Sequence, residues 1–181
     1  MPEIIMETER LILRTQADGD QAVWVKHMNT PAVMDHLGGP RDPHKIEASF
    51  AKMAAHRAQY GYSFMLMQHK STGELIGNCG LKHVDNILAP IEVHGQFEIG
   101  WSLREDYWRK GYAFEAACAV LDLAFTRFDA PRIFAFTAER NVPSWKMMEK
   151  LGMARRADLD FADPDYPPED NPTIVYSIEK N

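Results

Sequence analysis

The sequence has few of the features that mark secreted, membrane or nucleic-acid-binding proteins. Its 181 residues include two cysteines, Cys79 and Cys118, too few for a disulfide framework, so we expect reduced thiols in the core. No apolar run approaches the roughly 18 residues that span a bilayer, and no signal pattern opens the chain. The net charge of −6 and the lack of long Lys/Arg runs argue against a nucleic-acid-binding surface. We therefore expect a cytoplasmic protein that binds neither nucleic acid nor membrane.

Several ligand-binding and catalytic motifs are missing too. The seven histidines are scattered, with no His-x-x-x-His or Cys-x-x-Cys spacing, so we expect no metal site. Gly-x-Ser-x-Gly, Gly-x-x-x-x-Gly-Lys-Ser/Thr and Gly-x-Gly-x-x-Gly are also absent, which weakens hydrolase, nucleotide triphosphatase and dinucleotide-binding interpretations. The chain is 45% apolar, enough for a full core, and shows no linker or repeat. One domain over residues 1–181 is expected.

What the chain does contain is a basic, glycine-containing turn, Tyr107-Trp108-Arg109-Lys110-Gly111-Tyr112-Ala113, between a predicted strand at 96–103 and an amphipathic helix. The helix has apolar residues at i, i+3, i+4 spacing: Ala116, Ala117, Val120, Leu121, Ala124, Phe125 and Phe128. A helix N-terminus with a glycine and two cations is a natural seat for a phosphate. The alternative is an ordinary loop with a solvated charge pair.

The rest of the chain predicts an α+β order of elements. Cap residues predict helices that begin near Asp18, Thr30 and Asp42, the third ending at Gly61, and a short helix that follows Asn141. Alternating or short apolar runs predict seven strands, at 9–14, 62–68, 74–81, 96–103, 131–137, 153–160 and 173–179. The fold class is therefore α+β, with one mixed sheet flanked by helices.

Six local sequences in this order resemble those of the GNAT acetyltransferase superfamily, within it the ribosomal-protein N-terminal acetyltransferase (RimJ/RimL-like) group. They are Thr8-Glu9-Arg10-Leu11-Ile12-Leu13-Arg14, Thr30-Pro31-Ala32-Val33-Met34, Gly73-Glu74-Leu75-Ile76-Gly77, Glu98-Ile99-Gly100-Trp101, the basic turn through Ala116, and Asn141-Val142-Pro143-Ser144 with Lys150-Leu151-Gly152-Met153. The resemblance implies a mostly antiparallel sheet of about seven strands. The superfamily pattern Arg/Gln-x-x-Gly-x-Gly/Ala is matched at Gly111 and Ala113, but Trp108 replaces its first residue.

The resemblance also implies acetyl-CoA as cosubstrate. Its pantetheine arm would pair with the backbone of Trp101, Ser102 and Leu103 like an added strand. Its pyrophosphate would rest on the amides of Arg109, Lys110, Gly111, Tyr112 and Ala113. Asn141 would hydrogen-bond the pantetheine, and Ser144 would lie near the thioester sulfur and protonate the leaving thiolate. Without the resemblance, capping of the helix is the ordinary reading of Asn141 and Ser144.

Acetyl transfer to an amine needs a neutral amine, so a base is expected. Glu98 is the first candidate, since it stands in an apolar stretch just before the cofactor-pairing segment; a structural carboxylate is the alternative. His83 and Asp85 are lesser candidates. The implied function is transfer of acetyl to a primary amine, most readily an α-amino group, whose pKa is near ~8. A small-molecule amine, or a non-catalytic acyl-CoA sensor, remains open.

The acceptor side is where the sequence says least. The stretch between the last two strands carries six carboxylates, which would favour a cationic acceptor; a solvated loop is the alternative. They are Asp158, Asp160, Asp163, Asp165, Glu169 and Asp170. The oligomeric state is left as monomer or homodimer, with Trp24 as an exposed aromatic that would support a dimer.

Overall fold

The computed structural model describes residues 1–180 and contains one eight-stranded sheet. Its strands lie in the order β1-β2-β3-β4-β5-β6-β8-β7, and neighbours are antiparallel except β5 and β6, which are parallel. The strands are β1 (Ile4–Glu7), β2 (Leu11–Arg14), β3 (Phe64–His69), β4 (Leu75–His83), β5 (Phe97–Leu103), β6 (Arg132–Ala138), β7 (Ala154–Arg155) and β8 (Thr173–Glu179). The expected mixed, mostly antiparallel α+β sheet is confirmed. It has one strand more than expected, because β1 pairs with β2 across a tight turn.

Five α-helices and several short 3-10 turns connect the strands. The α-helices are α1 (Asp20–His27), α2 (Pro31–Met34), α3 (Pro43–Tyr60), α4 (Tyr112–Arg127) and α5 (Val142–Lys150). The expected ends of α3 are confirmed: the Asp42 carboxylate accepts from the His44 N–H at 2.8 Å, and Gly61 closes the helix at φ 80°. The expected cap of α1 is wrong. Gly19 precedes the helix, and the Asp20 carboxylate is buried against Arg14 at 2.7 Å.

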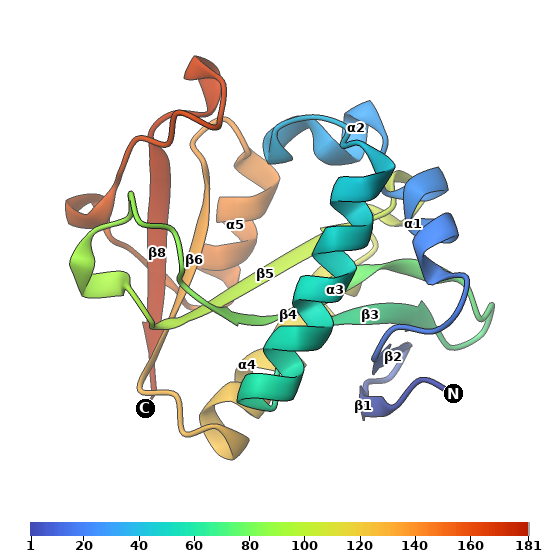
Figure 1. Cartoon of the computed structure of the whole chain (residues 1–181). Helices are drawn as coiled ribbons and strands as arrows, with labels where there is room; N and C mark the ends of the chain where they lie inside the picture. The colour runs from blue at the N-terminus through green and yellow to red at the C-terminus, as the bar shows by residue number, and fades with distance from the viewer. Residues whose placement is uncertain (181) are drawn as a thin grey trace.

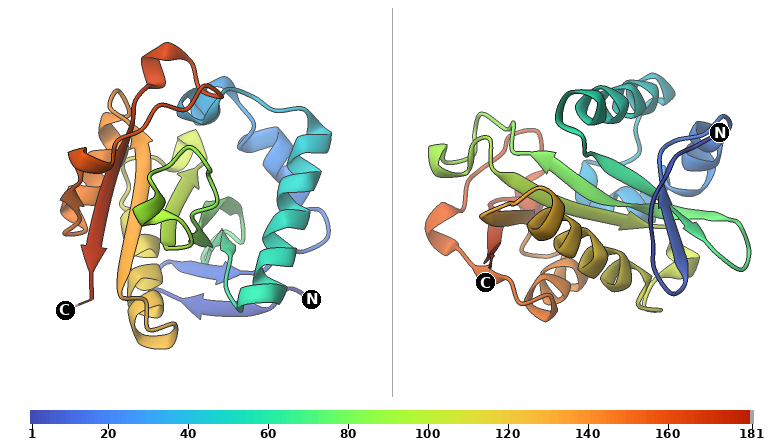
Figure 2. Two further views of the ribbon diagram at one scale, coloured as in Figure 1. Left: turned by 60° about the vertical axis from the view of Figure 1, so that its left-hand side comes forward. Right: turned by 90° about the horizontal axis from the view of Figure 1, so that it is seen from below.

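The two faces of the sheet are covered differently (Figures 1 and 2). Helices α4 and α5 lie on one face, and α3 crosses the other (Figure 2, right). The buried stripe of α4 packs on the side chains of β4 and β5 that point to its face, with Cys79 and Ile99 among them. Cys79 thus has the expected core position, and burial raises the pKa of its thiol. Cys118 does not, because it lies on the exposed side of α4.

The side of the sheet under α3 carries a smaller apolar cluster formed by Ile46, Phe50, Leu66 and Leu75. On β4 and β5 the even-numbered residues point to this side, because successive side chains of a strand alternate between faces. They are Asn78, Gly80 and Lys82 on β4, and Glu98, Gly100 and Ser102 on β5. Within residues 1–180, no helix combines the length and apolarity needed to cross a membrane.

Candidate active site

Strands β5 and β6 separate after a short stretch of pairing, as Figure 1 shows. They are in register at Phe97 with Ile133 and at Glu98 with Phe134, whereas β5 pairs with β4 over its whole length. On the β4 side, Arg104 N–H donates to the Ile76 carbonyl at 2.8 Å. The antiparallel ladder therefore turns the backbone groups of the odd residues of β5 toward β6. Past Glu98, no β6 residue in the described chain pairs with them.

Ile99, Trp101 and Leu103 are the odd residues along this open edge of β5. The Leu103 carbonyl accepts a hydrogen bond from the indole N–H of Trp108 at 2.8 Å. Trp108, the departure from the superfamily pattern, thus fastens the basic turn to the end of β5. The N–H and C=O of Trp101 face the gap between the strands, where an extended ligand can add to the edge.

The basic turn has two residues in the left-handed region, Arg109 at φ 59° and Gly111 at φ 84°. Gly111 is the N-cap residue of α4, and the helix receives no side-chain cap. The turn is held from outside by Arg10, which donates to the Lys110 carbonyl at 2.9 Å and to Glu115 at 2.6 Å. The first amides of α4 are therefore presented by a rigid turn, as a phosphate seat requires.

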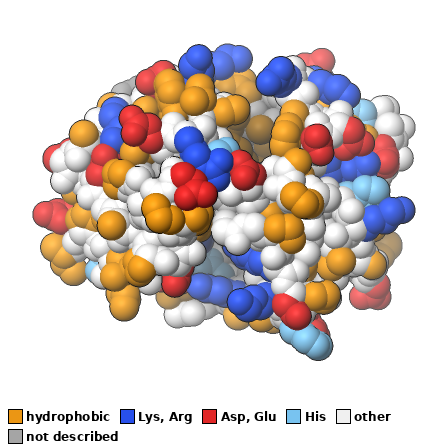
Figure 3. Space-filling model, turned by 90° about the horizontal axis from the view of Figure 1, so that it is seen from above, with side chains coloured by type: hydrophobic (Ala, Val, Ile, Leu, Met, Phe, Trp, Pro, Cys, Tyr) orange, Lys and Arg blue, Asp and Glu red, His pale blue; other side chains and the backbone are white. Residues whose placement is uncertain are grey.

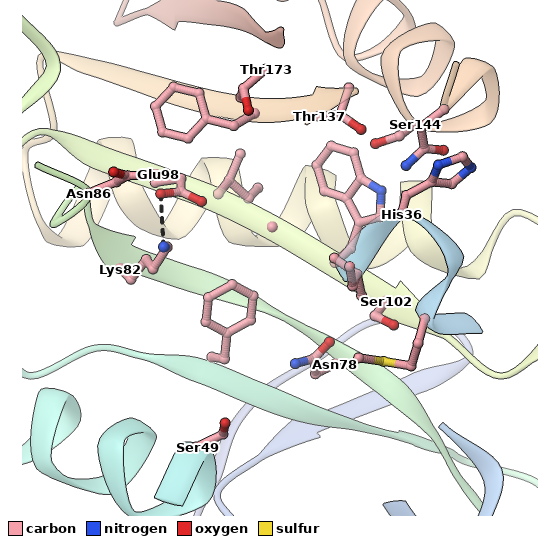
Figure 4. A pocket seen from close by; sticks show the side chains of 18 of the residues that line it. His36, Ser49, Asn78, Lys82, Asn86, Glu98, Ser102, Thr137, Ser144 and Thr173 are labelled. Atoms are coloured by element: carbon pink, nitrogen blue, oxygen red, sulfur yellow. Dashed lines mark ion pairs between the residues drawn. The ribbon is translucent and has the colours of Figure 1, made fainter. Parts of the chain in front are cut away.

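Asn141 and Ser144 lie at the start of α5. Asn141 is the N-cap residue, but its side chain makes no cap hydrogen bond; the Ser144 N–H instead donates to its backbone carbonyl at 3.0 Å. Ordinary capping therefore leaves the Asn141 amide unexplained. In the close-up, Ser144 lies near His36 and Thr137, on the far side of β5 from Asn78 (Figure 4).

A cleft of about 480 Å³ opens between the sheet, α1 to α3, and the segment before β8. It brings together five predicted site residues: Glu98, Trp101, Ser102, Asn141 and Ser144. The other six, Leu103 and residues 109–113, are not among its lining residues. They follow one another from the end of β5 to the start of α4, so the predicted site has two parts. In the space-filling view from above, hydrophobic atoms lie in a hollow with charged side chains around it (Figure 3).

Glu98 lies at one end of this cleft in an ion pair with Lys82, at 3.1 Å (Figure 4). Burial raises the pKa of Glu98, and the attraction of Lys82 reduces but does not cancel this effect. Burial alone would lower the pKa of Lys82, but Glu98 and Asp85 outweigh it and the pKa is raised. A carboxylate of raised pKa is a stronger base than a solvated one.

The two lesser base candidates lie outside the lining of the cleft. The His83 ring shares a hydrogen bond with the Tyr62 hydroxyl at 2.8 Å, and burial lowers its pKa. Burial, together with the neighbouring Tyr60, raises the pKa of Tyr62 to about 12. Asp85 pairs with Lys52 at 2.6 Å, which holds the pKa of its carboxyl below the usual range despite partial burial. Neither group lines the cleft that Ser144 and Trp101 share.

The expected acidic rim is not present as a set of free carboxylates. Asp163 and Asp170 line the cleft, but both are buried. Asp163 accepts from the Asn86 amide at 2.8 Å, and Asp170 accepts from the Arg140 guanidinium at 2.6 Å. Arg156 pairs with Asp158 at 2.6 Å, and Arg155 binds Asp160. Four of the six carboxylates therefore hold segments of the protein itself, which weakens the expectation of a cation-selective rim; the preference for a cationic acceptor stays a prediction.

Trp24 also differs from its expected role. Its ring packs edge-on against Phe50, with centroids 5.8 Å apart, and it lines the cleft. The residue therefore belongs to the wall of the cleft, and its exposure offers no support for a dimer.

Sequence reasoning missed Phe64, Asn78 and Lys82, all on the floor of the cleft. Asn78 stands directly opposite Ser102 in the sheet, and its Oδ1 atom is buried with no hydrogen-bond partner in residues 1–180. The alternation of Asn78, Gly80 and Lys82 in a predicted strand was the available signal. The register with β5, which makes these residues neighbours of Ser102, Gly100 and Glu98, cannot be read from the sequence.

A family model, described as an acetyltransferase (GNAT) domain, matches residues 10–154. The chain belongs to the GNAT acetyltransferase family. Its relatives include the uncharacterized protein YkkB of Bacillus subtilis (strain 168), 32% identical over 81% of this chain and 83% of that protein. A solved acetyltransferase from Agrobacterium tumefaciens str. C58 is 30% identical and superposes with a TM-score of 0.78, covering 97% of this chain and 94% of its own.

Two solved structures of lower identity share the fold and differ in acceptor. RimL, a ribosomal L7/L12 α-N-protein acetyltransferase, is 15% identical with a TM-score of 0.77, over 99% of this chain and 96% of its own. Spermidine N-acetyltransferase from Vibrio cholerae, in complex with CoA and spermine, is 18% identical with a TM-score of 0.73, over 94% and 95%. The GNAT chain described here is thus an N-acetyltransferase. Its similarity to RimL and to the spermidine acetyltransferase shows a shared fold and does not identify its acceptor.

Proposed function

We propose that this GNAT protein transfers the acetyl group of acetyl-CoA to a primary amine, with the α-amino group of a peptide or protein as the first candidate. One observation carries the proposal: the open edge of β5 at Trp101 lines the same cleft as an Asn141 side chain that makes no cap hydrogen bond. A backbone edge and a facing amide are what an extended pantetheine chain needs. A single domain over residues 1–181 is part of this proposal.

The residues at hand fit the cosubstrate. The backbone of Trp101 and Leu103 would pair with the pantetheine arm, whereas the backbone groups of Ser102, an even residue of β5, face β4. The amides of residues 109–113 would hold the pyrophosphate. Acetyl-CoA supplies an activated acyl group on a thiol, which leaves readily. The protein contributes alignment of this group against the amine, and a backbone N–H of the 99–103 segment to hydrogen-bond the carbonyl oxygen.

Two side chains would move the protons. Glu98 accepts the proton of the amine, and the Ser144 hydroxyl donates one to the departing sulfur and regains it from solvent water. Glu98 and Ser144 stand at opposite ends of the cleft in Figure 4, and β5 rises about 3.3 Å per residue, so we infer that water relays the proton to Glu98. An α-amino group, with a pKa near ~8, needs only a weak base at neutral pH.

Substitution Ser144→Ala tests this assignment. We expect kcat, measured by release of free thiol from acetyl-CoA with peptide acceptors, to fall about 100-fold. The Kd for CoA should change less than about twofold, because the hydroxyl contributes little to cofactor binding beside the backbone groups. Ser49→Ala, which also lines the cleft but from α3, is the matched control and should keep full kcat. Unchanged turnover in Ser144→Ala would remove the residue from the mechanism.

A small-molecule amine is the second candidate acceptor. It is favoured by the volume of about 480 Å³, which suits a compact ligand. A non-catalytic acyl-CoA sensor would bind CoA and release no thiol with any amine. Turnover with either class of amine separates the enzyme from the sensor.

A further inference from the structure

The floor of the cleft has an apolar centre between two polar ends. Gly80 and Gly100 are directly opposite each other in the sheet, and the ring of Phe64 lies over Gly100. A Cβ on Gly100 would come within 2.9 Å of the Phe64 ring, and one on Gly80 within 2.3 Å of its backbone. Gly100 therefore allows the ring, and Gly80 the backbone of Phe64, to approach the two strands closely. Lys82 and Glu98 flank the glycine pair on one side, and Asn78 and Ser102 on the other (Figure 4).

Aromatic and aliphatic side chains also form the walls above this floor. Trp24 and Phe50 meet edge-on on the α3 side, and Phe136 and Phe161 meet edge-on at 5.8 Å on the β6 side. All four line the cleft. A bound molecule would therefore contact apolar surface on two sides and below.

The charged groups of the cleft are balanced. Its lining includes three carboxylates, Glu98, Asp163 and Asp170, and three permanent cations, Arg41, Lys52 and Lys82. Glu98 is paired with Lys82 and Asp170 with Arg140, while Asp163 accepts from the Asn86 amide and from the Asp165 N–H at 3.0 Å. Each carboxylate thus already has a donor from the protein. Glu98 and Asp170 are therefore neutralised by cations of the protein, and only Asp163, which is buried and already accepts from two N–H groups, has no cation partner in the described chain. A second ammonium group on a ligand would lose its water with at most this one counter-ion to gain.

We propose that the acceptor is a monoamine whose remaining body is apolar, resting on the Phe64 ring between the aromatic walls. This inference rests on the proposed acetyl transfer and names the acceptor class for it. The amine is the acceptor's single cation and becomes neutral before it reacts. Two kinds of molecule present such an amine: a small apolar amine and a peptide whose first residue is apolar. Polyamines, and α-amines next to a cationic side chain, are excluded as good acceptors.

Matched acceptors test the proposal on the unmodified protein. Thiol release from acetyl-CoA is measured with 2-phenylethylamine, phenylalanine amide, lysine amide and spermidine. We expect kcat/KM for the better apolar amine to exceed that for lysine amide and spermidine at least tenfold. Preference for 2-phenylethylamine over phenylalanine amide identifies a small amine as the source, and the reverse identifies a peptide. Equal or better turnover with lysine amide or spermidine overturns the inference while acetyl transfer stands.

Substitution Phe64→Leu localises the effect. We expect KM for the apolar acceptor to rise at least fivefold with the Kd for CoA unchanged, because the ring is lost from the floor and the edge of β5 is intact. Phe125→Leu, a partly buried ring on α4 outside the cleft, is the matched control for stability. An unchanged KM in Phe64→Leu overturns the assignment of this floor. Release of no thiol with any amine, with CoA still bound, overturns the proposed function and the inference together.

Discussion

At the start of α4, the groups that face the expected phosphate seat follow one another along the chain from Arg109 to Ala113, and most are backbone amides. The acceptor cleft, in contrast, is formed by segments that are far apart in the chain. Its lining comes from segments between α1 and β8, and its chemistry comes from side chains such as Glu98 and Lys82. The comparison shows why one end of a site can be common to many relatives while the other end differs.

The largest effect on activity is expected from a substitution in the acceptor cleft. Glu98→Gln removes the base, and we expect kcat to fall about 100-fold or more. In the unmodified protein kcat should fall at acid pH as Glu98 becomes protonated, with an apparent pKa above the ordinary 4.5 because burial raises it. The pH profile of kcat, measured by thiol release, should lose this acid limb in Glu98→Gln. A limb that persists would assign the titration to another group.

Substitution of Lys82, the ion-pair partner of Glu98, tests whether Glu98 is the group that titrates. Lys82→Met removes the charge that opposes the effect of burial, so the acid limb should move to higher pH. Lys52→Met is the matched control: its charge also lowers the pKa of Glu98, but as a smaller contribution, and the limb should move less in the same direction. Thermal unfolding of both variants identifies any loss of kcat that results from reduced stability alone. If Glu98 is not the base, the acid limb of the kcat profile should keep its position in Lys82→Met.

The raised pKa of Glu98 also makes the free energy of unfolding depend on pH. Because its folded pKa is raised, the folded state binds this proton more tightly than the unfolded state. The resulting stabilisation is complete below the ordinary value of 4.5 and is lost as pH rises through the folded pKa. Denaturant unfolding from pH 4 to 8 should show this loss in the unmodified protein and not in Glu98→Gln. A parallel pH dependence in the two proteins contradicts the shift.

A smaller effect is expected at the cofactor end. Gly111→Ala places a Cβ at φ 84° and 3.3 Å from Arg10 Nη2, which strains the turn and displaces the residue that holds it. We expect the Kd for CoA, measured by calorimetry, to rise about tenfold, equivalent to roughly 1.4 kcal/mol. Gly95→Ala is the matched control, since its φ is 71° and no atom lies within 4 Å of the new Cβ. Equal CoA affinity in the two variants would show that the turn does not hold the cofactor.

The same contrast explains what the sequence could predict. The strand, the basic turn and α4 are contiguous, so periodicity and a glycine were enough to locate them. The pairing of Lys82 with Glu98 depends on the register of β4 against β5, which has no local signal. The carboxylates before β8 were predicted to form an acidic rim for a cationic acceptor, because their count along the chain does not reveal that Arg140 and Asn86 reach two of them from distant segments. Strand β1 was missed because four residues carry little periodicity.

The smallest expected effect tests whether the phosphate seat depends on its amides. Lys110→Ala should raise the Kd for CoA less than about threefold at physiological salt, because exposed charges contribute little there. The Lys110 ammonium also donates to the Asp106 carbonyl at 2.7 Å, so it is already engaged within the turn. Arg109→Ala should behave alike, and both effects should grow at low ionic strength. A rise of more than tenfold in either variant would move cofactor recognition from the backbone to these side chains, and the two ends of the site would then be built in the same way.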